Sequence, residues 1–180
     1  MKRETLLRTL CKRGVSSTFV NAIKAIYQKV FSCVRMSSEF TDMFECPRGL
    51  RQGCVLSHTL FSVTINELAT EVSENGKHGV QLLPGLIDFV ILLFADDLAL
   101  LSCSPTGLQT QLDCLQRVCL DLGLIVNTDK SKVMVFRKGG FLERSERWFI
   151  GDNILEVVNR FLYPWLYFYN RHETVIFQDI

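Results

Sequence analysis

The chain has 180 residues, of which 48% are hydrophobic and 22% are charged. These fractions are close to those of an ordinary globular domain, and they exclude an intrinsically disordered chain and a collagen-like fibre. The formal net charge is only +1, but ten basic residues stand against four acidic ones in residues 1–51, and two against eight in residues 52–128. A basic arm beside an acidic middle is compatible with a nucleic-acid binder that also holds a cation, and equally with scattered solvated charge.

Cysteine usage points to a reducing compartment. The chain has seven Cys, no CxxC pair and only three His, so the paired ligands typical of a zinc site are missing. The N-terminus lacks the continuous apolar run of a signal peptide. We therefore expect an intracellular protein, nuclear or cytoplasmic, in which the thiols are small buried hydrophobic groups.

The most apolar stretch, residues 82–103, is long enough to span a membrane. Asp88, Asp96 and Asp97 interrupt it, and each Asp near the bilayer centre costs about 2.5–3.5 kcal/mol on insertion scales. Pro84 and Gly85 break the stretch as well. We therefore expect buried strands here and no membrane partner.

The first third of the chain predicts two short helices, a strand pair and a longer helix. The first helix covers residues 4–12 and stops at Gly14, and Ser16 or Ser17 can cap the second. The inward face of the second helix is predicted to be Phe19, Ile23, Ile26, Tyr27 and Val30. Strands are expected over residues 31–36 and 40–46, and a helix of about 14 residues is expected from Thr59.

The rest of the chain alternates strands with one helix. Residues 89–94 predict an apolar strand, 95–97 a turn and 98–102 a returning strand. Ser104 and Pro105 fit the N-cap and first position of a helix that ends at Gly123. Further strands are predicted over residues 124–126 and 132–136, and a hairpin around residues 151–153. The order predicts an α+β fold, a largely antiparallel sheet packed by helices.

The most informative feature is the pair Asp96 and Asp97 between two apolar runs. Two adjacent carboxylates repel each other, and a cation beside them relieves that repulsion. Carboxylate oxygens suit Mg²⁺, which leaves its remaining positions to water and substrate phosphates. The alternative is a solvated hairpin turn in which Asp only supplies turn chemistry, although apolar flanks of this density argue against it.

Three segments stand in order along the chain: the loop and helix start Arg48-Gly49-Leu50-Arg51-Gln52-Gly53-Cys54-Val55-Leu56-Ser57, the box Phe94-Ala95-Asp96-Asp97, and Gly123-Leu124-Ile125-Val126-Asn127 followed by Lys130 and Lys132. Together they resemble the reverse transcriptases, and their style resembles the non-LTR (LINE-type) retrotransposon enzymes. The resemblance covers about residues 1–162. It implies a polymerase palm that transfers nucleotides with Mg²⁺ (or Mn²⁺), using an RNA template, a DNA primer and deoxynucleoside triphosphates.

The resemblance also implies roles for individual residues. Asp96 and Asp97 would be the catalytic metal ligands. The nascent base pair would be contacted by Arg51, Gln52 and Gly53, and the triphosphate by Lys130. Contacts to the nucleic-acid backbone would come from Arg48 and Lys132. From the residues alone, the Arg48–Gly53 segment could be an ordinary turn before a helix, and Lys130 and Lys132 could lie in a solvated loop. Asn127 is expected to fix a turn, and Trp148 is expected in the core.

The sequence departs from the family pattern in two places. The stretch from Met1 matches the segment immediately after the first catalytic Asp of the family, so we expect that Asp, its strand and further polymerase segments to be missing. The loss should leave the neighbouring strands with unpaired backbone. Residues 163–180 are expected to form a divergent tail that need not belong to the fold, since Pro164 stands where a strand would continue.

These observations lead to one function and two alternatives. We expect a reverse transcriptase fragment, a partial palm that is inactive without the missing polymerase segments. The first alternative is a non-enzymatic retroelement remnant or co-opted nucleic-acid-binding module that uses the basic residues 1–51. The second is a metal-binding regulatory domain, which would bind Mg²⁺ without salt-dependent RNA binding.

Overall fold

The computed structural model describes residues 1–75, 79–81, 88–136, 146–163, 166–169 and 175–179. It divides the chain into two compact units, Met1–Thr64 and Ile65–Ile180, and the boundary falls inside helix α3 (Val55–Asn75). Helices and short, mostly antiparallel strand pairs alternate along the chain, which confirms the α+β prediction. Among the described residues, no helix is long and apolar enough to cross a membrane.

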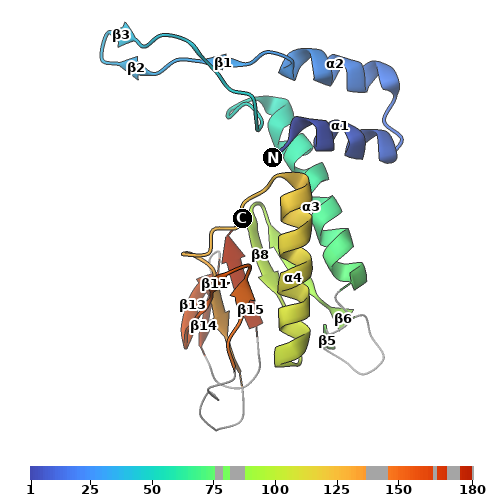
Figure 1. Cartoon of the computed structure of the whole chain (residues 1–180), viewed down its shortest axis with the longest axis vertical. Helices are drawn as coiled ribbons and strands as arrows, with labels where there is room; N and C mark the ends of the chain where they lie inside the picture. The colour runs from blue at the N-terminus through green and yellow to red at the C-terminus, as the bar shows by residue number, and fades with distance from the viewer. Residues whose placement is uncertain (76–78, 82–87, 137–145, 164–165, 170–174, 180) are drawn as a thin grey trace. The chain divides into compact units, whose positions relative to one another are not determined.

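The first unit is built on α1 (Arg3–Lys12), α2 (Ser17–Tyr27) and the start of α3 (Figure 1). The Ser16 hydroxyl accepts a hydrogen bond from the Phe19 amide and caps α2, one of the two caps that the sequence predicted. The shared core consists of Leu6, Leu10, Val20, Ile23, Tyr27, Val30 and Leu60. Phe19 and Ile26 are 49% and 40% exposed, so their predicted inward orientation is wrong; the buried stripe runs through Val20 instead.

A long hairpin arm leaves α2 and returns to the loop before α3 (Figure 1). Its base is the pair β1 (Phe31–Ser32) and β4 (Phe44–Glu45), and its tip is the pair β2 (Arg35–Met36) and β3 (Glu39–Phe40). The arm confirms the predicted strand pair, although each strand is broken into two short pieces.

Helix α3 begins at Val55, four residues before the predicted start at Thr59. The carbonyl of Arg51 accepts hydrogen bonds from the Cys54 amide and, at 2.6 Å, from the Ser57 hydroxyl. These bonds close a tight turn immediately before the helix, so the chain is already coiled when it reaches Val55.

The second unit contains a five-stranded sheet in the order β12-β9-β15-β8-β7. The strands are β7 (Ile91–Phe94), β8 (Asp97–Leu100), β9 (Lys132–Met134), β12 (Glu156–Val157) and β15 (Val175–Asp179). Among the strands that the structure describes in this sheet, only β12 and β9 pair in parallel. Two-stranded pairs join β5 (Val80–Gln81) to β6 (Asp88–Phe89), β10 (Phe149–Ile150) to β11 (Asn153–Ile154) and β13 (Arg160–Tyr163) to β14 (Leu166–Tyr169).

Helix α4 (Pro105–Leu122) follows its predicted boundaries. The Ser104 hydroxyl accepts from the Gly107 amide at 3.1 Å, and Gly123 ends the helix with a φ of +67°. Buried side chains of α4 share one core with β8, β9 and the second half of α3. Trp148 is 2% exposed in this core and donates its indole N–H to the Pro105 carbonyl, as expected of a core residue.

Three sequence predictions fail in this unit. Residues 124–126 form no strand: the Leu124 amide bonds back to the Cys119 carbonyl, and Ile125 is 86% exposed. The apolar hairpin is buried on one strand only, because β7 is the edge of the sheet and exposes 55% of Phe94. Nor are the thiols uniformly buried. The exposed ones belong to Cys11, Cys33 and Cys103.

Candidate active site

The acidic pair is placed by the tight turn between β7 and β8. Phe94 and Asp97 are paired across the hairpin, so only Ala95 and Asp96 form the turn itself. Ala95 has a φ of +56°, a left-handed conformation that residues with a Cβ rarely adopt. Asp96 is exposed and Asp97 is half-buried, because Asp97 is the first residue of the covered strand β8.

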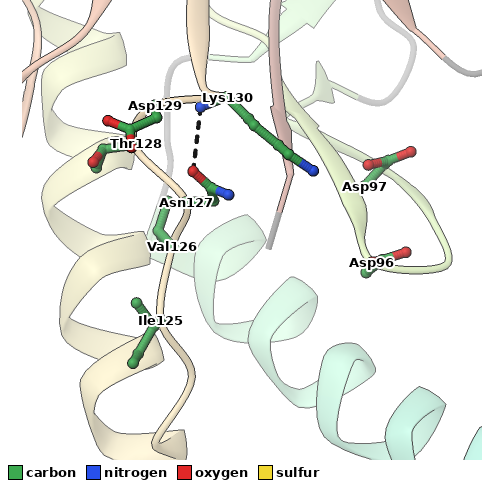
Figure 2. A pocket seen from close by; sticks show the side chains of 8 residues that line it. All are labelled: Asp96, Asp97, Ile125, Val126, Asn127, Thr128, Asp129 and Lys130. Carbon is green, nitrogen blue, oxygen red and sulfur yellow. Dashed lines mark hydrogen bonds between the residues drawn. The ribbon is translucent and has the colours of Figure 1, made fainter.

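Both aspartates line an open pocket of about 740 Å³. The opposite wall is the segment between α4 and β9. The residues that line the pocket are Asp96, Asp97, Ile125, Val126, Asn127, Thr128, Asp129 and Lys130. Figure 2 shows the Lys130 side chain extending from that wall toward the side on which the two aspartates lie. The pocket therefore combines carboxylates with an ammonium group, the charges needed to hold a cation together with a phosphate.

Asn127 organises the wall that carries Lys130. Its side-chain oxygen accepts from the Lys130 amide at 3.3 Å, and its carbonyl accepts from the Ser131 amide and hydroxyl at 3.0 and 2.7 Å. The turn that this produces confirms the role expected for Asn127. Asp129 lies in the same turn and lines the pocket, and sequence reasoning had not selected it. Its position between Asn127 and Lys130 was the only signal available.

Lys132 is engaged within its own sheet. Its ammonium lies 2.8 Å from the Glu156 carboxylate and donates to the Asp129 carbonyl at 2.7 Å. Glu156 is on β12, the parallel neighbour of β9. A contact between Lys132 and a nucleic-acid backbone would compete with this ion pair, so that role stays a prediction.

The glycine-rich loop belongs to the first unit. We call residues 48–53 the RQG loop; its Arg48, Arg51 and Gln52 are exposed. Gly49 and Gly53 have φ values of +76° and +80°, and a Cβ added at either would meet no atom within 4 Å. The glycines are therefore needed for the backbone conformation, and the space around them is open to a ligand.

Cys54 follows the RQG loop directly. A hydrogen bond from the Leu56 backbone to the sulfur, opposed by burial and supported by the Ser57 backbone, lowers the pKa of this thiol. Burial alone acts on Cys119 in the other unit and raises its pKa to about 12.

The donor set of the pocket suits a hard divalent cation. In the part of the chain that the structure describes, no three His, Cys, Asp or Glu side chains gather tightly enough to enclose a metal ion. Mg²⁺ does not need such a cage, since it is commonly held by one or two carboxylates together with water and substrate phosphates. Asp96 in the turn and Asp97 at the start of β8 supply that number of carboxylates.

A comparison with protein families identifies the chain. The family model described as Reverse transcriptase (RNA-dependent DNA polymerase) matches residues 2–162, nearly nine-tenths of the sequence. The match includes the acidic hairpin, the RQG loop and the wall that carries Lys130.

Proposed function

The chain belongs to the reverse transcriptase family, and from that premise we propose that its acidic pocket is the nucleotidyl-transfer site of a LINE-type retrotransposon polymerase. The observation that carries the proposal is the shared pocket of Asp96, Asp97 and Lys130. Reverse transcriptases generally depend on a divalent metal and bind an RNA template, a primer and deoxynucleoside triphosphates. We propose the same partners for this chain, and nuclear or cytoplasmic residence.

Each pocket residue has a separate task in this proposal. Asp96 and Asp97 hold Mg²⁺, or Mn²⁺ in its place; when bound, the cation neutralises charge on the phosphates. Lys130 contacts the triphosphate and is oriented by the turn that Asn127 closes. In the first unit, the exposed Arg51 and Gln52, with Gly53, contact template and incoming nucleotide, and Arg48 contacts the nucleic-acid backbone. In the second unit, Lys132 contacts the nucleic-acid backbone.

We also propose a boundary at residue 162 and the absence of primer extension by this chain alone. The family match ends at residue 162, which supports a division between a polymerase-derived part, residues 1–162, and a divergent tail, residues 163–180. We also propose that residues 1–180 by themselves do not extend a primer, and that further polymerase segments are required.

Mn²⁺ binding tests the site directly. The purified chain is titrated with Mn²⁺ in the presence of a deoxynucleoside triphosphate, and bound Mn²⁺ is measured by electron paramagnetic resonance. Mn²⁺ bound by the triphosphate alone is the background. Above it, Asp96→Asn and Asp97→Asn should each bind Mn²⁺ at least tenfold more weakly than the unchanged chain. The control is Asp152→Asn, because Asp152 is an exposed turn residue outside the pocket. Equal binding by all four proteins would reject the metal site.

Primer extension tests the chemistry. The chain is incubated with Mg²⁺, a primed RNA and labelled deoxynucleotides, and no extension is expected. Extension that Asp96→Asn abolishes would show that the chain is an active polymerase, contrary to the limit proposed above.

The second candidate function is a nucleic-acid-binding module without catalysis. Ten basic residues within residues 1–51, including the exposed Arg48 and Arg51, favour it. It predicts RNA binding that weakens steeply with salt and is unchanged by Asp96→Asn or by removal of divalent cations. Cation binding without salt-dependent RNA binding would instead support the regulatory metal-binding alternative.

A further inference from the structure

Arg3, the first residue of α1, joins three segments that are distant in sequence. Its Nε donates to the Gly49 carbonyl at 2.9 Å and one terminal nitrogen donates to the Tyr27 carbonyl at 3.0 Å. The other terminal nitrogen donates to the Cys46 carbonyl at 2.7 Å and to the Arg48 carbonyl at 3.4 Å. All five groups lie in the first unit, and two of the acceptors are in the RQG loop itself.

Tyr27 extends this network to the other end of the loop. The Arg3 guanidinium lies 5.5 Å from the centre of the Tyr27 ring. The Tyr27 hydroxyl is 3.2 Å from the Ser57 hydroxyl, which donates to the Arg51 carbonyl at 2.6 Å. Because the single Ser57 hydrogen is used on Arg51, the Tyr27 hydroxyl is the donor to Ser57. Tyr27 and Ser57 are both buried, so this relay is shielded from water.

The Arg3 hydrogen bonds and the Tyr27–Ser57 relay hold the RQG loop at its two ends. Arg3 fixes the carbonyls of Arg48 and Gly49, while the relay fixes that of Arg51. A backbone bond from the Gly49 amide to the Met1 carbonyl, at 3.1 Å, adds to the first anchor. The side chains of Arg48, Arg51 and Gln52 remain exposed between these anchors. The loop is therefore presented in one conformation before any ligand arrives, which lowers the ordering cost of binding.

We propose that Arg3 is a positioning residue, which acts through the RQG loop on the binding of primed RNA without touching the nucleic acid itself. The inference rests on the proposed function, since it takes the loop as the contact surface. Arginine is specifically suited to the task because its planar fork of five N–H donors can serve four carbonyls at once. A lysine ammonium has only three donors at a single point.

A double-mutant cycle tests the proposal with fluorescein-labelled RNA annealed to a DNA primer, and binding is followed by fluorescence anisotropy. Arg3→Gln should weaken binding about tenfold, and Arg51→Ala should add almost nothing in that background, because residues that act through one network are not additive. Arg3→Lys should restore part of the affinity. The control is Arg8→Gln, which removes the same charge from an exposed position of α1 and should change binding less than twofold.

Hydrogen exchange separates this inference from the proposed function. In Arg3→Gln, but not Arg8→Gln, the amides of Gly49 and Cys54 should exchange faster without RNA, since they bond to the carbonyls of Met1 and Arg51 at the two anchors of the loop. Unchanged exchange, or additive losses in the cycle, would overturn the positioning role. Faster exchange with RNA affinity unaffected by Arg3→Gln and Arg51→Ala would show that Arg3 orders the loop but that the loop does not bind RNA, which rejects the proposed contact. Arg3→Lys keeps the test usable if Arg3→Gln lowers the melting temperature.

Discussion

Asp179 lies directly opposite Asp97 in the antiparallel pair that β15 forms with β8. The same strand pairs on its other side with β9, where Ile176 is opposite Val133. The last described strand of the chain is therefore an interior strand of the sheet that presents the acidic turn. The sequence-based expectation that a missing strand leaves unpaired backbone is wrong for β8 and β9, because β15 pairs with both.

An Ile→Pro substitution in β15 should show how much the sheet depends on this strand. Proline cannot donate to a ladder, so inside a sheet it leaves a buried acceptor without its partner, which costs about 1–3 kcal/mol. Ile176→Pro is expected to lower the free energy of unfolding by about that amount in urea titrations. The control is Ile154→Pro in β11, a two-stranded pair in which Ile154 is 57% exposed, and it should cost less than half as much. Equal costs would mean that β15 is not an interior strand in solution.

The turn that carries Asp96 should become more stable when Ala95 is replaced by glycine. Ala95 has a φ of +56°, and the left-handed region costs a residue with a Cβ roughly 1–2 kcal/mol. Part of that gain is lost to the greater freedom of glycine in the unfolded chain. We expect Ala95→Gly to raise the free energy of unfolding by about 0.5–1 kcal/mol.

Ser37→Gly is the matched comparison, because Ser37 has a φ of +54° in the hairpin arm of the other unit. Both variants should stabilise the protein, whereas Mn²⁺ binding should respond to Ala95→Gly alone. A destabilised Ala95→Gly protein would show that the strain at Ala95 is absent in solution.

Local patterns predicted part of this molecule correctly. The Ser104 cap, the Gly123 stop and the acidic turn all depend on residues that are neighbours in sequence, so their chemistry could be read directly. The resemblance covered nearly the same residues as the family match. The hydrogen bond from the Lys130 amide to Asn127 is likewise a local feature, because the two residues are three positions apart in the sequence.

Long-range relationships could not be predicted. No periodicity indicates that β15 pairs with β8, because the two strands are far apart in the chain. The sequence around Arg3 does not indicate its acceptors, because they are 24 to 46 residues away. The early start of α3 depended on the Ser57 hydroxyl turning back to the Arg51 carbonyl, which a helical pattern does not reveal.

The cap of α4 should make a measurable contribution to stability. Ser104 accepts from the Gly107 amide at 3.1 Å, and replacing an N-cap serine by alanine typically costs about 1 kcal/mol. Ser104→Ala should therefore lower the free energy of unfolding by about that amount, while Ser104→Thr, which keeps the hydroxyl, should lose less than half of it. Equal losses in both variants would indicate that packing around Ser104, and not the cap, is responsible.

Cysteine alkylation should distinguish Cys54 from the other thiols. The hydrogen bond from the Leu56 backbone lowers the pKa of Cys54, so at neutral pH more of it is thiolate, the form that reacts. With iodoacetamide at pH 7 and peptide mass spectrometry, Cys54 should be labelled faster than the exposed Cys11 and Cys103. Cys119, whose pKa is raised to about 12 by burial, should stay unlabelled while the protein is folded.

The labelling rate of Cys54 should also depend on pH and on bound primed RNA. As pH falls through the lowered pKa of Cys54, protonation should slow its labelling. Primed RNA should protect Cys54 but not Cys103, since Cys54 directly follows the RQG loop. Labelling of Cys54 no faster than Cys11 would contradict the lowered pKa. Labelling unaffected by saturating primed RNA would instead place the nucleic acid away from this loop, whatever the reactivity of the thiol.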